Sequence, residues 1–280
     1  MRLHNPAADL FVPDGLETEA ALARTTHLCL AAHQDDIEIM AYHGIAQCFG
    51  RRDRWFTGVV ATNGAGSPRA GIYSSYTDEE MQKVRLVEQR KAAYVGEYAC
   101  QVQLGFTSAQ VKDSRETAVA EDFEQILLAT RPDVVYLHNL ADKHDTHVAV
   151  ALRSIAALRA VRAQSRPKKV YGCEVWRDLD WLPDADKQSL AVSERSNVAA
   201  ALVAVFDSQV SGGKRYDLAT AGRRLAHATY FASHGTDAES ALTFAMDLTP
   251  LVEDPDLAPA DYVLGFIDRF RADVEQRLKR

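Results

Sequence analysis

Two clusters of histidines and carboxylates, far apart in the chain, have the spacing of a metal-assisted catalytic site. In the first, His33, Asp35 and Asp36 directly follow the apolar run THLCLAA. In the second, His144 and His147 lie in the segment DKHDTHVAVAL. Residues three apart lie on one side of a helix entry, so each cluster could direct two side chains at one ion. Such groups are costly to bury together unless something binds them, which indicates a ligand.

These residue types suit a catalytic zinc ion. Two histidines and one carboxylate are a common shell for this metal and leave an open position for water. His33 and Asp36 would supply two ligands, and His144, His147 or both would complete the set. A bound metal lowers the pKa of water toward neutrality. Asp35 lies beside a proposed ligand but cannot share its direction, so it would serve as the general base for that water.

Simpler structural roles compete with this interpretation. Asp35 or Asp36 could cap the helix that follows the first cluster. Asp145 or Thr146 could cap the helix that follows the second. Glu38 lies in a first helical turn, where the dipole favours a carboxylate, so a structural and a functional role both stay open. A lone HxxD or HxxH often arises by chance, and only the two clusters together at strand ends favour a metal site.

Strands and helices alternate along most of the chain and predict the frame that positions both clusters. We expect strands at 26–32, 55–62, 100–106, 133–139 and 168–176, and helices at 37–48, 78–99, 119–130 and 146–163. This alternation is typical of an α/β fold with a Rossmann-like, mostly parallel sheet and helices on both faces. Sites in such sheets lie at the carboxyl ends of the strands, so both clusters would share one edge.

The chain reads as a single domain over residues 1–280. We expect a Rossmann-like core at 25–188 and a C-terminal α+β elaboration at 189–280, where helices and the strand-like SALTFAMDL follow without a clear linker. The residues before 25 contain Pro6 and Pro13 and predict an irregular lead-in.

Composition and charge exclude several classes of protein. The chain has 280 residues, of which 47% are hydrophobic and 25% charged, and its net charge is −7. This acidity argues against nucleic acid as a partner, because phosphate contacts need a basic face. The sequence has no run of about 18 apolar residues, so we expect no membrane-spanning helix. The N-terminus lacks the pattern of a signal peptide. The four cysteines form no CxxC pair, which predicts reduced thiols and a cytoplasmic protein; a homo-oligomer stays open.

Two motifs resemble the signatures of one enzyme family. The segment AAHQDDIEI is similar to the AHPDD(x)E signature of the PIG-L/LmbE-like zinc N-deacetylases. The segment RPDVVYLHNLADKHDTHVAV resembles the second signature of that family, in the same order along the chain. The resemblance covers residues 25–155 and continues more weakly in FDSQ and AESALTF, which look like later segments of the family.

The resemblance implies a Rossmann-like fold and one divalent metal ion. Zinc is the usual ion, and the same ligands accept Fe²⁺, Co²⁺ or Mn²⁺. It implies a hydrolase of linear amide C–N bonds that removes the N-acetyl group from an N-acetylglucosamine-type sugar or glycoconjugate. On the matching positions, His33, Asp36 and His147 would be the metal ligands and Asp35 the general base.

The resemblance also implies residues that contact the substrate. His144 matches the histidine that stabilises the oxyanion or protonates the leaving amine. Arg85 in RLVEQRKAA matches an arginine that lines the substrate pocket, although a packing or salt-bridge role stays open. Asn63 in ATNGAG falls where the family loop approaches the sugar, although Asn-Gly also suits a simple turn.

The chain departs from the family pattern at three positions. Gln34 stands where the family has proline, which removes a rigid turn but no ligand. Thr146 takes the place of an aspartate expected to pair with His144, so Asp142 or Asp145 would have to orient that ring instead. Asp207 replaces the histidine of the HxSQ segment, so no particular sugar is carried over from the family.

Two other functions stay open at this point. The same metal shell could serve a hydrolase for a different amide or an ester. The chain could also be a non-catalytic sugar-binding protein on the same scaffold. A binding protein has no need of a base beside its ligands, so Asp35 argues against the second alternative.

Overall fold

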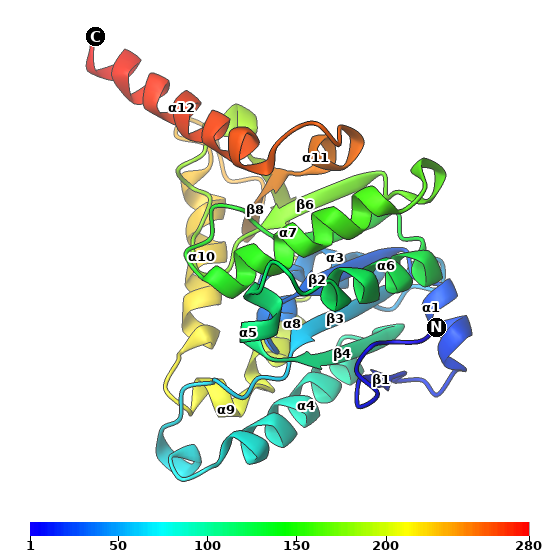
Figure 1. Ribbon diagram of the computed structural model, residues 1–280. Helices are drawn as coiled ribbons and strands as arrows, with labels where there is room; N and C mark the ends of the chain where they lie inside the picture. The colour runs from blue at the N-terminus through cyan, green and yellow to red at the C-terminus, as the bar shows by residue number, and fades with distance from the viewer. Residues whose placement is uncertain (280) are drawn as a thin grey trace.

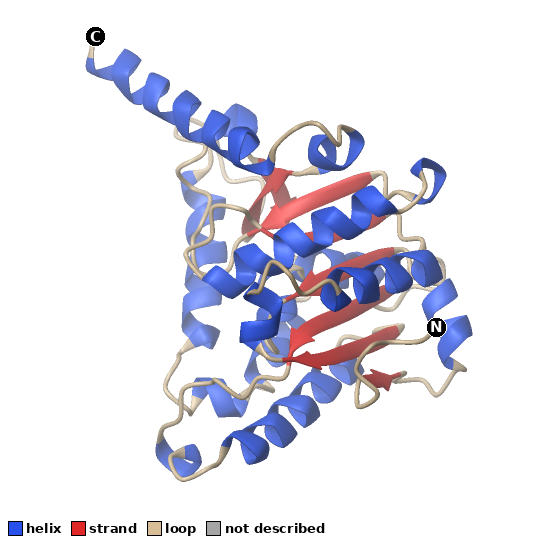
Figure 2. Cartoon of the chain, viewed as in Figure 1, coloured by secondary structure: helices blue, strands red, loops and turns tan. Residues whose placement is uncertain are grey.

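The computed structural model describes residues 1–279, which contain an eight-stranded sheet, drawn in red in Figure 2. The strands are β1 (Asp9–Phe11), β2 (His27–Ala31), β3 (Phe56–Thr62), β4 (Cys100–Phe106), β5 (Val134–His138), β6 (Lys169–Cys173), β7 (Gln188–Ala191) and β8 (Leu242–Asp247). Their order across the sheet is β1-β4-β3-β2-β5-β6-β8-β7. Strands β4, β3, β2, β5 and β6 are parallel to their neighbours within this group, whereas β1 and β8 pair with them antiparallel.

Helices cover the sheet on both faces. They are α1 (Thr18–Ala23), α2 (Asp36–Met40), α3 (Tyr42–Cys48), α4 (Asp78–Val95), α5 (Ser108–Lys112), α6 (Ala118–Thr130), α7 (Asp145–Ala160), α8 (Ser196–Ala204), α9 (Asp207–Val210), α10 (Tyr216–Tyr230), α11 (Thr249–Glu253) and α12 (Pro259–Leu278). In Figure 1, α6 and α7 cross the front of the sheet, α3 and α8 lie behind it, and α12 projects from the body. Within residues 1–279, no helix combines the length and the apolar character needed to cross a membrane.

The central strands are buried because helices shield both faces of the sheet. Along β2, Leu28 and Leu30 belong to one apolar cluster, and Cys29 and Ala31 belong to the other. This alternation follows from the two-residue period of a strand, which sends successive side chains to opposite faces. The run THLCLAA is therefore apolar without interruption, because neither of its faces meets solvent.

The structure confirms the predicted α/β fold with its mostly parallel sheet, and all five predicted strands are present. It corrects three details. The lead-in is not irregular throughout, because it contains α1 and the short strand β1, which pairs with β4. Strand β7 was not expected. The helix predicted over 37–48 is broken at Ala41 into α2 and α3.

The break between α2 and α3 has a cause outside that segment. Arg224 of α10 donates from Nη2 to the backbone oxygens of Glu38 (2.9 Å) and Ile39 (3.0 Å). In a continuous helix those two carbonyls would accept hydrogen bonds from the next turn. The local sequence pattern predicts an unbroken helix, because it contains no sign of an arginine that lies far away in the chain.

The C-terminal part of the chain completes the same sheet. Strand β8 pairs with β6, and β7 pairs with β8 at the outer edge. The residues after 188 therefore supply strands to the sheet and helices to its surface, as an α+β elaboration would. The boundary at 188 between a core and an elaboration of one domain stays a prediction.

The buried carboxylate of Glu174 ties these C-terminal elements to the end of β6. It lies 3.0 Å from Nε2 of His227 in α10 and accepts backbone N–H groups of Leu179 (2.6 Å) and of Phe244 in β8 (2.9 Å). Burial raises the pKa of Glu174, but His227 and the backbone donors outweigh that effect and hold the pKa below its usual value. The ionised form is thus part of the folded structure.

We expect Glu174→Gln to lower the free energy of unfolding by about 2 kcal/mol at pH 7, because an amide replaces a charged, buried acceptor. The depressed pKa makes this contribution complete above the unfolded-state pKa of about 4.3, and it is lost as the pH falls through the folded-state value. The difference between wild type and variant should therefore shrink below about pH 4. Urea denaturation over a pH series measures it, and a difference that grows in acid would contradict the assignment.

Candidate active site

Both polar clusters lie at the carboxyl edge of the sheet, at the point where the strand order reverses. Strand β3 pairs with one side of β2, and β5 pairs with the other side. Such a switch point opens a crevice between the loops that follow the two central strands. The loop after β2 carries His33, Asp35 and Asp36, and the loop after β5 leads to His144 and His147 at the start of α7.

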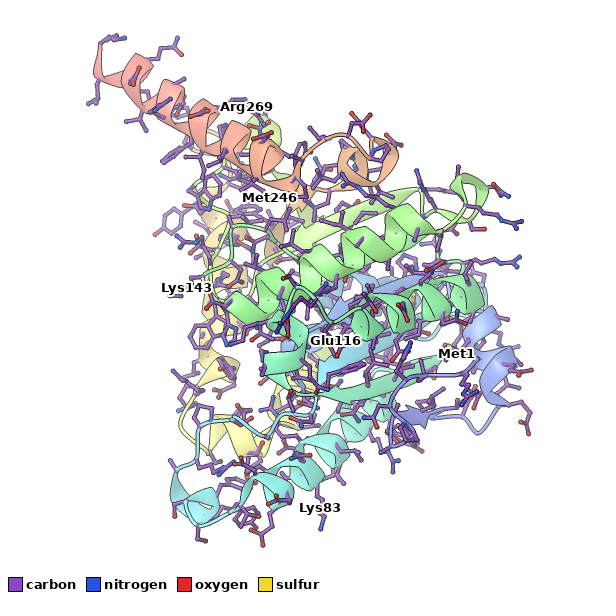
Figure 3. The ribbon with its side chains drawn as sticks, viewed as in Figure 1. Met1, Lys83, Glu116, Lys143, Met246 and Arg269 are labelled. Atoms are coloured by element: carbon purple, nitrogen blue, oxygen red, sulfur yellow. The ribbon has the colours of Figure 1, made fainter. Side chains whose placement is uncertain are left out.

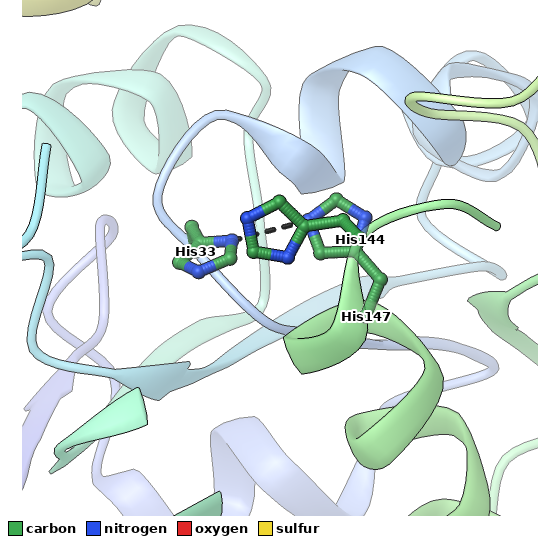
Figure 4. A group of neighbouring side chains, drawn as sticks. All are labelled: His33, His144 and His147. Carbon is green, nitrogen blue, oxygen red and sulfur yellow. Dashed lines mark hydrogen bonds between the residues drawn. The ribbon is translucent and has the colours of Figure 1, made fainter. Parts of the chain in front are cut away.

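Three donor atoms converge in this crevice at nearly equal separations. His33 Nδ1 lies 3.1 Å from His147 Nε2 and 3.2 Å from Asp36 Oδ2. His147 Nε2 lies 3.3 Å from the same oxygen. Figure 4 shows the side chains of His33, His144 and His147 gathered together, with the contact between the ring nitrogens of His33 and His147 as a dashed line. These three atoms, called the donor triangle below, could hold a divalent cation.

Helix capping does not account for either cluster. Asp35 is the N-cap residue of α2 and His144 is the N-cap residue of α7, and neither side chain makes a capping hydrogen bond. Asp36 Oδ2 instead accepts the backbone N–H of His33 at 2.7 Å. The two residues after His144 lie inside the first turn of α7 rather than at its cap. The capping interpretation is therefore wrong.

The backbone at Asp35 adopts a conformation that is rare for a residue with a side chain. Its φ is 88°, and its N–H is held by Gln89 Oε1 at 3.2 Å. The turn sends two adjacent carboxylates to different places. Asp36 meets the histidines, whereas Asp35 lines the pocket with its Oδ2 3.6 Å from Arg85 Nη2. Backbone strain of this kind persists where the surrounding structure enforces it, and it clusters at functional sites.

His138, to which no role was assigned from the sequence, lies beneath the donor triangle. Its ring is fully buried and stacks on His147, with the ring centroids 4.0 Å apart. Its Nε2 accepts the backbone N–H of Ala32 at 2.9 Å and lies 3.5 Å from Asp36 Oδ2. Atoms of Asp36, His138 and His147 also lie close enough to share an ion, as do those of His33, His144 and His147. The Nε2 lone pair of His138 accepts the N–H of Ala32 and is not free for a metal, so we assign His138 a supporting role. Its position as the last residue of β5 is the sequence feature that could have identified it as part of the site.

Asp142 faces His147 rather than the ring of His144. Its Oδ2 lies 3.5 Å from His147 Nδ1, which is an ion-pair distance without hydrogen-bond geometry, and accepts the backbone N–H of Trp176 at 3.1 Å. Within residues 1–279, the hydrogen bond that its Oδ1 accepts comes from the backbone N–H of His144 and not from the ring. Asp145, the other carboxylate expected to orient His144, is exposed. A carboxylate behind a metal-binding histidine orients that ring, and Asp142 is the carboxylate placed behind His147 rather than behind His144.

Stacking, not a hydrogen bond, holds the ring of His144. Its centroid lies 4.5 Å from that of His147 and 6.3 Å from that of Trp176, and it is nearly parallel to both. Its Nδ1 is buried and has no hydrogen-bond partner within residues 1–279. Burial lowers the pKa of His144, and the neighbouring His147 and His33 lower it further. The ring is therefore neutral near pH 7.

The pKa values of the two adjacent carboxyl groups move in opposite directions. Burial opposes ionisation of Asp36, but His147 and the hydrogen bond from His33 outweigh it and hold the pKa of Asp36 below its usual range. Burial raises the pKa of Asp35; Arg85 counteracts this effect and Asp36 reinforces it. Paired carboxyl groups with separated pKa values are typical of acid–base sites. A bound cation would favour the ionised form of both.

A cavity of about 460 Å³ opens beside the cluster and is lined by His33, Asp35, Asp36 and His144. Its other walls come from the glycine-rich loop after β3, from Trp176 after β6, and from α5, α9 and α10. This volume falls in the range of roughly 300–1,000 Å³ that small-molecule sites occupy.

Arg85 lies in the pocket wall, as the resemblance implies. Its side chain is buried, and its Nη2 donates to the backbone oxygen of Gln34. Its Nε and Nη1 have no hydrogen-bond partner within the described chain. Gln34 donates in turn from Nε2 to Thr62 O (3.1 Å) and Gln103 Oε1 (3.2 Å). These hydrogen bonds hold the turn that a proline would otherwise stiffen.

The structure does not bring Asn63 into this pocket. Its Oδ1 accepts the backbone N–H of Ala65 at 3.2 Å, which is the turn role of an Asn-Gly pair. Its side chain lines a separate small cavity. Residues that follow it line the main pocket instead: Gly64, Gly66, Ser67 and Pro68.

The FDSQ segment anchors the wall of the pocket. Asp207 Oδ2 accepts the hydroxyl of Tyr73 at 2.6 Å, which fastens the loop after β3 to α9. Ser208 donates from its backbone N–H (2.7 Å) and its hydroxyl (2.6 Å) to Glu88 of α4. Gln209 lines the cavity. The aspartate that departs from the family pattern therefore has a structural contact of its own.

Glu38 supports the turn from below and does not line the pocket. It is fully buried and accepts hydrogen bonds from the Tyr98 hydroxyl (2.8 Å) and Gln89 Nε2 (2.9 Å). Burial raises the pKa of Glu38 to about 8. Because Gln89 also holds the N–H of Asp35, the surroundings of Glu38 favour a structural role.

Solved structures with this fold share little sequence with the chain. A conserved protein of Thermus thermophilus has a TM-score of 0.62 at 18% identity, over 79% of this chain and 94% of that one. The N,N'-diacetylchitobiose deacetylase of Pyrococcus horikoshii has a TM-score of 0.61 at 12% identity, over 79% of this chain and 83% of that one. The 4-carboxy-2-hydroxymuconate hydratase of Pseudomonas putida has a TM-score of 0.56 at 15% identity, over 80% of this chain and 96% of that one. This likeness shows the fold alone, which serves both a deacetylase and a hydratase.

No curated protein matches the chain in sequence. The sequence model of one family, described as PIG-L: GlcNAc-PI de-N-acetylase, matches residues 28–160. This stretch runs from β2 to the end of α7 and contains the donor triangle, Asp35 and Arg85. The resemblance inferred from two short motifs is thereby confirmed, and residues 28–160 form a domain of the PIG-L family.

Proposed function

We propose that this protein is a metal-dependent hydrolase that removes the N-acetyl group from an N-acetylglucosamine-type sugar or glycoconjugate. The donor triangle of His33, Asp36 and His147, with the carboxyl group of Asp35 beside it, carries the proposal. The PIG-L domain at 28–160 supports this reaction. The fold is compatible with it, since N,N'-diacetylchitobiose deacetylase has a similar one.

A zinc ion fits the donor triangle. In a tetrahedral site with ligand bonds of about 2.0–2.1 Å, ligand atoms lie roughly 3.3 Å apart. The separations among His33 Nδ1, Asp36 Oδ2 and His147 Nε2 are 3.1, 3.2 and 3.3 Å. Two imidazoles and one carboxylate leave a position for water or substrate. Because the same donors accept Fe²⁺, Co²⁺ or Mn²⁺, we propose one divalent cation, with zinc as the first candidate.

A bound divalent cation would lower the pKa of a water molecule in the site and polarise the acyl carbonyl. Asp35 would act as the general base, since its carboxylate lines the pocket next to the donor triangle. It would take a proton from the attacking water and return a proton to the departing nitrogen. Water adds to the carbonyl carbon, the C–N bond breaks, and acetate and the free amine leave.

His144 and Arg85 would assist from the pocket walls. The His144 ring lines the pocket and is fixed by its neighbours, so its N–H could donate to the developing oxyanion or to the leaving amine. Arg85 lies beside Asp35 and would hold that carboxylate in position while it lines the substrate site.

Two other functions would use the same residues differently. A hydrolase of another amide or an ester would keep the donor triangle and Asp35 but accept a different acyl group. A sugar-binding protein would have no use for the strained backbone at Asp35. Assays of the zinc-loaded protein with N-acetylated sugars, other amides, esters and phosphoesters distinguish the three.

We also propose a cytoplasmic location. All four cysteines are buried and free. Free thiols are typical of a reducing compartment, so this observation supports the location without specifying it.

Asp35→Asn should abolish most turnover while the protein keeps its fold and its metal. Removing a general base lowers the rate by about 10²–10⁴-fold. Asparagine tolerates the positive φ of this position, so the backbone is not the cause of the loss. Release of free amine from an N-acetylated sugar measures the rate. A variant that retains more than about a tenth of wild-type turnover would remove Asp35 from the mechanism.

Elemental analysis distinguishes the proposed ligands from their neighbours. Wild-type protein purified without chelators or a histidine tag should contain about one equivalent of zinc or iron per chain. Asp36→Asn should lose this metal, because one atom of the donor triangle is replaced, whereas His144→Ala should retain it. The reverse outcome would assign the site to His33, His144 and His147. Wild-type protein that binds no divalent ion after reloading would reject the metal site.

A further inference from the structure

The pocket is rich in positive charge although the chain is acidic overall. Its lining includes Arg85, Lys112 and Lys214, and the carboxylates in the lining are Asp35 and Asp36. The whole chain carries a net charge of −7. A divalent cation on the donor triangle would balance the two carboxylates. Arg85 lies beside Asp35, so Lys112 and Lys214 are the cationic side chains of the lining that would face the cavity without a neighbouring carboxylate.

The two pocket lysines have no carboxylate partner in the described chain. Ion pairs of lysine within residues 1–279 involve Lys168, Lys169 and Lys187, not Lys112 or Lys214. Lys112 is exposed at the end of α5, whereas Lys214 is partly buried. A partly buried ammonium group without a counterion favours an anion from outside the chain.

Trp176 holds the positive charge at one wall of the pocket. Lys214 Nζ lies 5.1 Å from the centre of its ring, and Lys143 Nζ lies 5.8 Å from it. Figure 3 labels Lys143 at the edge of the molecule where α7 begins. His144 stacks on the same ring and Tyr216 meets it edge-on. The wall next to the proposed catalytic histidine therefore attracts anions.

We infer that the substrate carries a phosphate or a carboxylate outside its N-acetyl group, and that Lys112 and Lys214 bind this anion at the mouth of the pocket. The inference rests on the proposed deacetylase function, which puts the acetamide at the donor triangle. Asp36 of the triangle is buried, whereas the two lysines are more exposed. With the acetamide at the triangle, the part of the substrate that reaches the lysines is the rest of the sugar or its aglycone, and this part would carry the anion. Lysine binds such anions as a point charge and is suited to either.

Matched substrates test the inference with the zinc-loaded enzyme. We expect kcat/KM for N-acetylglucosamine 1-phosphate or 6-phosphate to exceed that for N-acetylglucosamine by at least about tenfold. The uronic acid of the same sugar shows whether a carboxylate serves as well as a phosphate. The advantage should shrink as ionic strength rises, because salt screens partly exposed charges.

Substitution of the lysines assigns the advantage to them. Lys112→Gln and Lys214→Gln should each lower the ratio of kcat/KM for charged over neutral substrate by about tenfold, mainly through KM. Lys168→Gln is the matched control, because Lys168 directly precedes β6 and lies at the opposite end of that strand from Trp176. The control should keep the wild-type ratio. If Lys214 only packed on Trp176 and Lys112 were only a solvated surface charge, neither substitution would change the ratio.

Calorimetric titration of zinc-loaded Asp35→Asn separates this inference from the proposed function. If no sugar is deacetylated by wild type but the charged sugar binds through the lysines, the proposed reaction fails and the anion site stands. Equal turnover and affinity for charged and neutral sugars would overturn the inference and leave the deacetylase function intact. A preference for charge that survives both lysine substitutions would also overturn it, because another group then binds the anion. Absence of both binding and turnover would overturn both proposals.

Discussion

One oxygen atom, Oδ2 of Asp36, holds the centre of the site together. It accepts the backbone N–H of His33 at 2.7 Å and lies within 3.5 Å of ring nitrogens of His33, His147 and His138. A carboxylate buried among imidazoles is stable only when positive charge or protons balance it. The loop after β2, the end of β5 and the first turn of α7 must all meet at this oxygen. The strained turn at Asp35 is one consequence, because it separates the directions of two adjacent carboxylates.

Buried polar side chains from distant segments support that turn. Gln89 of α4 holds the backbone of Asp35 and the carboxylate of Glu38. Arg224 of α10 binds the carbonyl groups where α2 ends. The C-terminal segment therefore stabilises the site as well as extending the sheet. These contacts are satisfied only when all three segments are in place, which makes the site a property of the whole chain.

The fold locates chemistry but does not choose it. A switch point between β2 and β5 creates a crevice at the carboxyl ends of the strands whatever the reaction. Structures of this fold include a deacetylase and a hydratase. The arguments for hydrolysis here come from the donor atoms, the carboxyl group of Asp35 and the PIG-L domain. The lysine-rich mouth of the pocket belongs to this chain and bears on its substrate rather than on its reaction.

Local patterns in the sequence were sufficient for the strands, for most helices and for the two polar clusters. Burial periodicity and the spacings within each cluster, from His33 to Asp36 and from His144 to His147, are local properties, and the motif resemblance rests on them. What required the folded chain was the order of the strands, because only the pairing of β2 with β5 brings the clusters together. The same holds for Asp142, which faces His147, and for Asn63, which turns away from the pocket. Such contacts depend on side-chain directions set by packing between segments far apart in sequence, and no local pattern encodes those directions.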